Sequence, residues 1–220
     1  MTRGAILLAA LASATAAAQG LNATADAITG LRPVGGGAAK ASRTKVVGDV
    51  TPFLGAKNTG RAAWRFEYPK AEPFHRTFVA TLDASTGRLL HITATGDSKP
   101  DSNVKPMPSS ASATKQLKVE GEEYAGYPPA NPAIDFATAL KRIETSAAAQ
   151  EIHAVYVLHR RAGTAMAKPV WAITLRGIPP IPARGPAGDS VPVWKRNQMR
   201  YVVDATTGEV LFSTNTPTPE

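Results

Sequence analysis

The stretch Tyr201-Val-Val-Asp-Ala-Thr-Thr-Gly-Glu-Val-Leu211 is typical of a β-hairpin, with two apolar strands joined by a polar turn. An earlier segment, Ala80-Thr-Leu-Asp-Ala-Ser-Thr-Gly-Arg-Leu-Leu90, repeats the pattern. In each copy an aspartate ends the first strand, where its carboxylate can accept the N–H groups of the next residues. A glycine follows four residues later, at the position that most often needs a positive φ. These structural turn residues are Asp83 and Gly87 in the first copy, and Asp204 and Gly208 in the second.

The N-terminus has the three parts of a secretory signal peptide. Residues 1–3 are a short basic start, residues 5–17 are an apolar run, and Ala16-Ala-Ala18 is a small-residue cleavage site. The apolar run is too short to span a membrane. We therefore expect residues 1–18 to be removed and the mature protein to be exported, to the periplasm or the extracellular medium, with no transmembrane segment.

The composition limits the kinds of site that the chain can hold. It has no cysteine, which excludes disulfides, cysteine-based metal sites and a cysteine nucleophile. The 25 Lys and Arg residues outnumber the 17 Asp and Glu residues, and the formal net charge is +8. This balance favours acidic partners such as anionic cell-envelope polymers. Nucleic acid is not expected as a partner, because the chain is expected to be exported and its positive charges are scattered.

No group of residues has the spacing of a catalytic or metal-binding motif. The four histidines are scattered, without an H-x-x-x-H pair. The nucleophile elbow, the Walker A loop and the dinucleotide fingerprint are all absent from the sequence. We therefore expect no catalytic residue, no metal and no cofactor, and a hydrolase is the least favoured class.

Hydrophobic periodicity and turn residues divide the chain into two units joined by a linker. The first unit, 40–95, contains expected strands at 44–50, 62–68, 76–82 and 88–93. Residues 96–130 are rich in proline and serine and are expected to be a linker. The second unit, 131–214, begins with Asn131 as an expected N-cap and a helix from Pro132 to about Gln150. Its expected strands are 152–159, 169–176, 194–204 and 209–213.

The predicted helix, the strand opening Pro169-Val-Trp171 and the hairpin at 201–211 together resemble the PepSY domain family. The first unit resembles it through Trp64 and the turn Leu82–Arg88. The resemblance implies a cystatin-like α+β fold, with a helix packed on an antiparallel sheet, here in tandem. It also implies a non-catalytic role, because the activity proposed for the family is to inhibit or chaperone a peptidase.

A long proline-rich segment, residues 177–193, connects two expected strands of the second unit. Loops of this length are often functional. We expect it to contact a partner through Arg176, Arg184 and Trp194; the alternative is a variable surface insertion.

Two functions follow from these features. The first is an exported, non-catalytic protein-binding module that inhibits or regulates a secreted or periplasmic peptidase, or binds another envelope protein. The alternative is a structural or envelope-associated protein that binds acidic polymers through its net positive charge. Inhibition in a purified assay favours the first, and salt-sensitive retention on cell envelopes favours the second.

Overall fold

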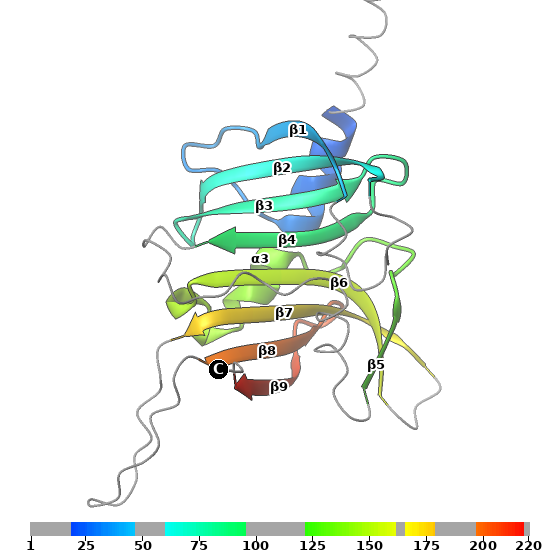
Figure 1. The fold of residues 1–220 in the computed structure, drawn as a ribbon, viewed down its shortest axis with the longest axis vertical. Coiled ribbons are helices and arrows are strands. Elements are labelled where there is room, and N and C mark those ends of the chain that lie inside the picture. Colours follow the sequence, from blue (N-terminus) through cyan, green and yellow to red (C-terminus); the bar gives the residue numbers. More distant parts are fainter. Residues whose placement is uncertain (1–18, 47–59, 96–121, 162–165, 179–196, 218–220) are drawn as a thin grey trace, which may run out of the picture.

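Nine antiparallel strands form one continuous sheet in the computed structural model of the chain, which describes residues 19–46, 60–95, 122–161, 166–178 and 197–217 (Figure 1). The strands follow the order β1-β2-β3-β4-β6-β7-β8-β9, and β5 lies beside β6. Their bounds are β1 Lys40–Lys45, β2 Ala62–Ala71, β3 Arg76–Asp83, β4 Leu89–Thr95, β5 Glu122–Gly126, β6 Glu151–Arg161, β7 Lys168–Ile178, β8 Asn197–Asp204 and β9 Val210–Pro217.

The α+β class predicted from the sequence, with a cystatin-like helix packed on a sheet in each of two tandem units, is wrong. Strands account for 52% of the structure and helices for 17%, and the architecture is a single sheet. The two halves merge because β4 pairs directly with β6, from Ile92↔Ala154 to Thr95↔Glu151. An unpaired strand edge exposes a row of backbone donors and acceptors, so joining the two edges satisfies groups that separate units would leave open.

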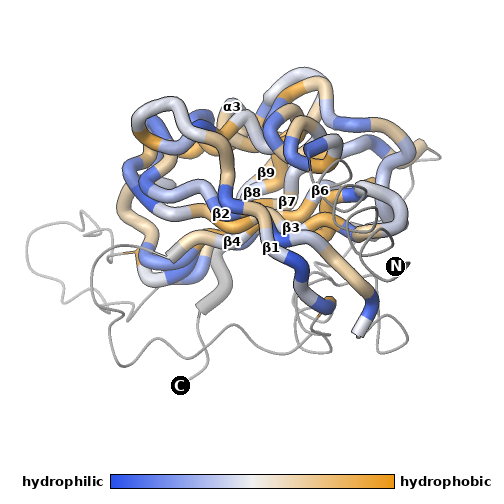
Figure 2. Tube along the Cα trace, turned by 90° about the horizontal axis from the view of Figure 1, so that it is seen from above, coloured by the Kyte–Doolittle hydropathy of each residue, from blue (hydrophilic) through white to orange (hydrophobic). Residues whose placement is uncertain are grey.

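The helices are short and lie on one side of the sheet (Figure 2). They are an N-terminal helix over residues 19–29, α3 Phe136–Lys141 and the 3-10 helix η2 Glu144–Ala148. The single long helix predicted from Pro132 is therefore wrong in length, and its N-cap is Asp135, whose Oδ1 accepts the N–H of Thr138 at 2.7 Å. The α-helical turn ends because Ile143 adopts an extended conformation (φ −106°, ψ 97°). Ala147, which lies within the range of the predicted helix, is exposed.

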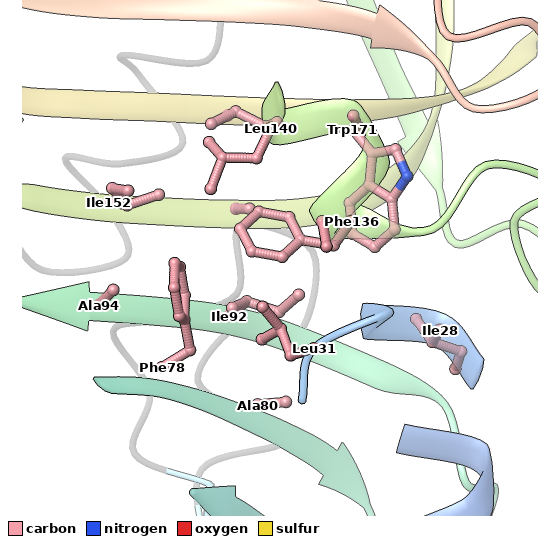
Figure 3. Packing of buried hydrophobic residues seen from close by; sticks show 14 of the residues in the cluster. Ile28, Leu31, Phe78, Ala80, Ile92, Ala94, Phe136, Leu140, Ile152 and Trp171 are labelled. Carbon is pink, nitrogen blue, oxygen red and sulfur yellow. The ribbon is translucent and has the colours of Figure 1, made fainter. Parts of the chain in front are cut away.

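One hydrophobic core lies between the helices and the sheet and receives residues from both halves of the chain (Figure 3). Each strand contributes alternate residues to this core, since every second side chain of a strand points to the same face. A chain of aromatic contacts runs through it, with ring centroids 5.6 Å apart for Phe74–Phe78 and Phe78–Phe136, 5.7 Å for Phe136–Trp171 and 5.2 Å for Trp171–Tyr156.

Polar contacts also join the halves. Arg76, at the start of β3, donates hydrogen bonds to the carbonyl oxygens of Ala149 (2.8 Å) and Ala147 (3.2 Å) at the end of η2. Gly30, with φ of +62°, lies so close to Asp135 that a Cβ atom would approach the carboxyl carbon to 2.4 Å. The end of the first helix and the start of α3 therefore meet at a position that only glycine fits.

Some predicted segments lie elsewhere or outside the described residues. The strand expected at 44–50 is found as β1 Lys40–Lys45, and β5 Glu122–Gly126 forms within the segment expected to be a linker. The predicted signal peptide, residues 1–18, lies outside the described residues. Within the described ranges, no helix combines the length and the apolar character that a bilayer crossing requires.

Candidate binding groove

A groove of about 630 Å³ opens where the β3–β4 turn meets the N-terminal helix, and we call it the corner groove. Three segments form its walls: one face of the helix, the turn itself and the chain that follows β5. Tyr156 of β6 adds a side chain to the lining. The lining residues are Gly20, Leu21, Thr24, Ile28, Ala84–Leu89, Tyr127–Asn131 and Tyr156.

The turn wall is held in shape by Asp83. Its Oδ1 accepts the N–H groups of Ser85 (2.8 Å) and Thr86 (3.0 Å), and its Oδ2 lies 3.0 Å from Arg61 Nη2. Burial by itself would raise the pKa of Asp83, but the hydrogen bonds from Ser85 and Thr86 and the charge of Arg61 lower it below its ordinary value. The turn closes with Gly87 at φ +67°, whose N–H donates to the carbonyl of Asp83 at 2.9 Å.

The other walls bring apolar and aromatic groups to the groove. Leu21 of the helix contacts the turn so closely that a Cβ on Gly87 would lie 3.2 Å from its Cδ2. The guanidinium of Arg88 stacks over the ring of Tyr127 at 5.5 Å from its centroid, a favourable cation–π arrangement. Burial raises the pKa of Tyr156, so this phenol stays neutral.

The chemistry of this lining is suited to recognition. The described lining residues carry hydroxyls, two phenols, five apolar side chains of which two are alanines, two prolines, one carboxamide and one guanidinium, without a carboxylate, an imidazole or a thiol. A pocket with an apolar body and a few polar groups that fix orientation is typical of a binding site.

The second predicted turn has the same geometry as the first but lies far from it. Asp204 Oδ1 accepts the N–H groups of Thr206 (2.8 Å) and Thr207 (3.2 Å), and Gly208 has φ +77°. Three strands, β4, β6 and β7, separate β3 from β8, which places the two turns roughly 19 Å apart at about 4.8 Å per strand. Asp83 and Asp204 therefore do not form a carboxylate pair.

The predicted partner contact is only partly described. Arg184 and Trp194 lie outside the described residues. Arg176 is 5% exposed, and its Nη1 lies 3.2 Å from Glu151 Oε2 across the β6–β7 pair. The guanidinium of Arg176 is thus buried in an ion pair within the sheet, and its contact with a partner stays a prediction.

A polar row on the sheet face opposite the helices was not predicted. It follows the register across five strands through pairs in which residues lie directly opposite each other: Thr93↔His153, His153↔Thr174, Thr174↔Arg200 and Arg200↔Thr214. Thr174 and Arg200 are buried, and burial lowers the pKa of Arg200. These residues are far apart in the sequence, so only the strand pairing reveals the row. Since a slip of one residue would exchange the faces, the row supports a single register.

His91 lies beside this row. Its ring stacks on that of His153, with centroids 6.0 Å apart, and its Nδ1 is buried without a hydrogen-bond partner among the described residues. Burial, and secondarily the charge of His153, lower the pKa of His91 to about 3. Across the described ranges, no three or more His, Asp or Glu side chains come together in a way that could hold a metal ion.

Comparisons with known proteins add no relative: no protein-family model matches the chain, and no curated protein or solved structure shows significant similarity to it.

Proposed function

We propose that this chain is an exported, non-catalytic module that binds another protein. The observation that carries the proposal is the corner groove, whose described lining combines apolar, aromatic and hydrogen-bonding groups. Arg88 and Tyr127 supply a cation and an aromatic face, the side-chain types that contribute most to binding at protein interfaces.

The partner we propose is a secreted or periplasmic peptidase, which the module inhibits or regulates. The choice of a peptidase as the partner is supported by the PepSY-like hairpins alone. In particular, it is supported by the repeated Asp-x-x-x-Gly turns, whose hydrogen bonds are the same in both halves. Export is proposed on the features of residues 1–18.

The test is capture of partners by the chain, expressed with its own residues 1–18 and recovered from periplasm or medium. The groove variant Arg88→Glu removes the cation–π contact and reverses one charge of the lining. Its matched control is Lys141→Glu, an exposed lysine in the last turn of α3. We expect the wild type and the control to retain the same peptidase, and the groove variant to lose it.

Purified components then test regulation, with peptidase turnover measured against the concentration of the module. Equal capture by wild type and Arg88→Glu would contradict a role for the groove. Capture of no protein at all by the wild type would contradict the binding function itself.

A second candidate is association with acidic polymers of the cell envelope. The formal net charge of +8 favours it, since scattered positive charge attracts polyanions in a salt-dependent manner. Retention on isolated envelopes that is lost between low and high salt, and that Arg88→Glu and Lys141→Glu weaken equally, would support this candidate over the first.

A further inference from the structure

Strand β1 forms one outer edge of the sheet (Figure 1). It pairs on one side with β2, from Lys40↔Glu67 to Lys45↔Ala62, and the described residues supply no strand on its other side. Five of its six residues are exposed and the sixth is half-buried. An edge of this kind presents a row of backbone donors and acceptors on which another extended chain can pair.

The charge on this edge is of one sign. β1 carries Lys40, Arg43 and Lys45 and no acidic residue. Arg43 is held in place by stacking over Trp64, 5.2 Å from the ring centroid. The nearest acid in the register, Glu67 opposite Lys40, lies 3.5 Å from Arg65 and is thereby partly neutralised.

A second copy of the chain is a poor occupant of the edge. Antiparallel pairing of β1 with itself about its centre would place Lys40 opposite Lys45, and parallel pairing in register would stack each basic residue on its equivalent. Like charges directly opposite each other destabilise a strand pair, whereas opposite charges stabilise it. The edge therefore disfavours its own copy and favours an acidic strand.

We propose that β1 is a docking edge that an extended acidic segment of a partner protein extends by one strand. The inference rests on the binding function proposed above and names the chemistry of its partner. The edge is close to the corner groove, because Lys45 pairs with Ala62, whose carbonyl accepts the N–H of groove residue Ala84 at 3.1 Å. Two strand spacings, about 10 Å, separate the two surfaces, so one partner can contact both.

The probe is a blocked seven-residue peptide of alternating glutamate and valine, titrated against the full-length chain by fluorescence anisotropy. The edge variant combines Lys40→Glu and Lys45→Glu, and the control combines Lys141→Glu and Lys168→Glu, two exposed lysines away from β1. We expect the edge variant to weaken binding at least about tenfold and the control to weaken it by less than about twofold, since only screened long-range attraction is lost.

Two further peptides separate strand addition from loose attraction. A fully N-methylated version keeps the glutamates but cannot donate backbone hydrogen bonds, so we expect it to bind at least about tenfold more weakly. A version with lysine in place of glutamate should not bind. Amide exchange should slow in β1 when the glutamate peptide is added and stay unchanged in β9, the opposite edge.

The proposal is overturned if the N-methylated peptide binds as well as its parent, if the edge and control variants lose affinity equally, or if no peptide binds. The first outcome would mean that the edge attracts polyanions without strand pairing, the second that the attraction is not located at the edge, and the third that the charges of the edge only protect it from aggregation. Failure here is distinguishable from failure of the binding function. If the edge variant still captures the partner, only the proposal that β1 is a docking edge is overturned. If the peptide binds but the wild type captures no partner protein, only the proposed protein-binding function is overturned.

Discussion

Phe78 of β3 and Phe136 of α3 meet edge to face, with ring centroids 5.6 Å apart, although 58 positions separate them in the sequence. Both side chains are fully buried. Phe78 belongs to the first half of the chain and Phe136 to the second, so this contact lies where the two halves share their core (Figure 3). Because one core and one sheet span both halves, we expect them to unfold together.

Phe78→Ala tests this shared core. Removing a buried phenylalanine leaves a cavity and typically costs about 3–5 kcal/mol of unfolding free energy. We expect a loss of this size, with urea transitions for amides of β3 and of β7 that stay coincident. Val79→Ala is the control on the same strand, because Val79 points to the other face and is only half-buried, and it should cost less. Separate transitions for the two strands in the wild type would contradict the single cooperative unit.

The turn glycines give a second prediction. Alanine at Gly87 or Gly208 must adopt a positive φ, which costs roughly 1–2 kcal/mol for a residue with a Cβ. At Gly87 the added atom would also press on Leu21 at 3.2 Å, whereas at Gly208 its nearest neighbour is 3.8 Å away. We therefore expect both variants to be destabilised in thermal unfolding, and only Gly87→Ala to change amide exchange in residues 19–29. Gly37→Ala, at an open position without positive φ, should be close to neutral; an equal loss there would contradict the argument.

These turns show what the sequence can predict and what it cannot. The hairpins were predictable because Asp83 and Gly87 act on neighbouring residues through local hydrogen bonds. The strand β5 was missed because its pairing with β6 is a tertiary contact and its acidic residues favour a solvated segment. The pairing of β4 with β6, which overturns the predicted fold class, is likewise not revealed by the hydrophobic periodicity of the sequence.

The corner groove could not be predicted from the sequence for the same reason. Arg88 follows a predicted turn and Tyr127 lies in a segment expected to be a linker, and only the fold brings them together. The burial of Arg176, a residue predicted to contact a partner, was missed for a related reason. Its position beside a proline-rich loop suggested exposure, but strand alternation turns it to the face where Glu151 lies opposite.

Asp83→Asn tests the carboxylate that holds the groove wall. The pKa of Asp83 is lower in the folded protein than in an unfolded chain, so the folded state binds this proton less tightly. The resulting stability is present above the ordinary aspartate pKa of about 3.9 and is lost as the pH falls through the folded value. We expect the variant to lose about 1 kcal/mol at pH 7, through the missing ion pair with Arg61, and to lose less than the wild type between pH 5 and pH 2.

Chemical unfolding across that range measures the difference. Glu209→Gln removes an exposed carboxylate beside the other turn and reports the effect of losing one acid in general. Parallel pH profiles for the wild type and Asp83→Asn would show that Asp83 does not contribute to acid unfolding.

His91 predicts a separate loss of stability in mild acid. The imidazole is buried against His153 and its pKa is lowered to about 3, whereas an unfolded histidine titrates near 6.5. Between these values the unfolded chain binds a proton that the folded protein does not, so stability is complete above about 6.5 and falls as the pH decreases towards 3. The slope for one proton is about 1.4 kcal/mol per pH unit, which gives a loss of roughly 2 kcal/mol between pH 7 and pH 5.

His91→Gln should remove this slope whatever it does to stability at pH 7, because the test compares pH dependence and not absolute stability. His75→Asn is the matched control, since it removes an exposed imidazole at a turn position of positive φ that asparagine tolerates. The measurement is the unfolding free energy in urea at pH 7, 6 and 5 for all three proteins. If His91→Gln keeps the wild-type dependence of unfolding free energy on pH, His91 is protonated in the folded sheet. A charged imidazole would then be tolerated at this position on the face opposite the helices.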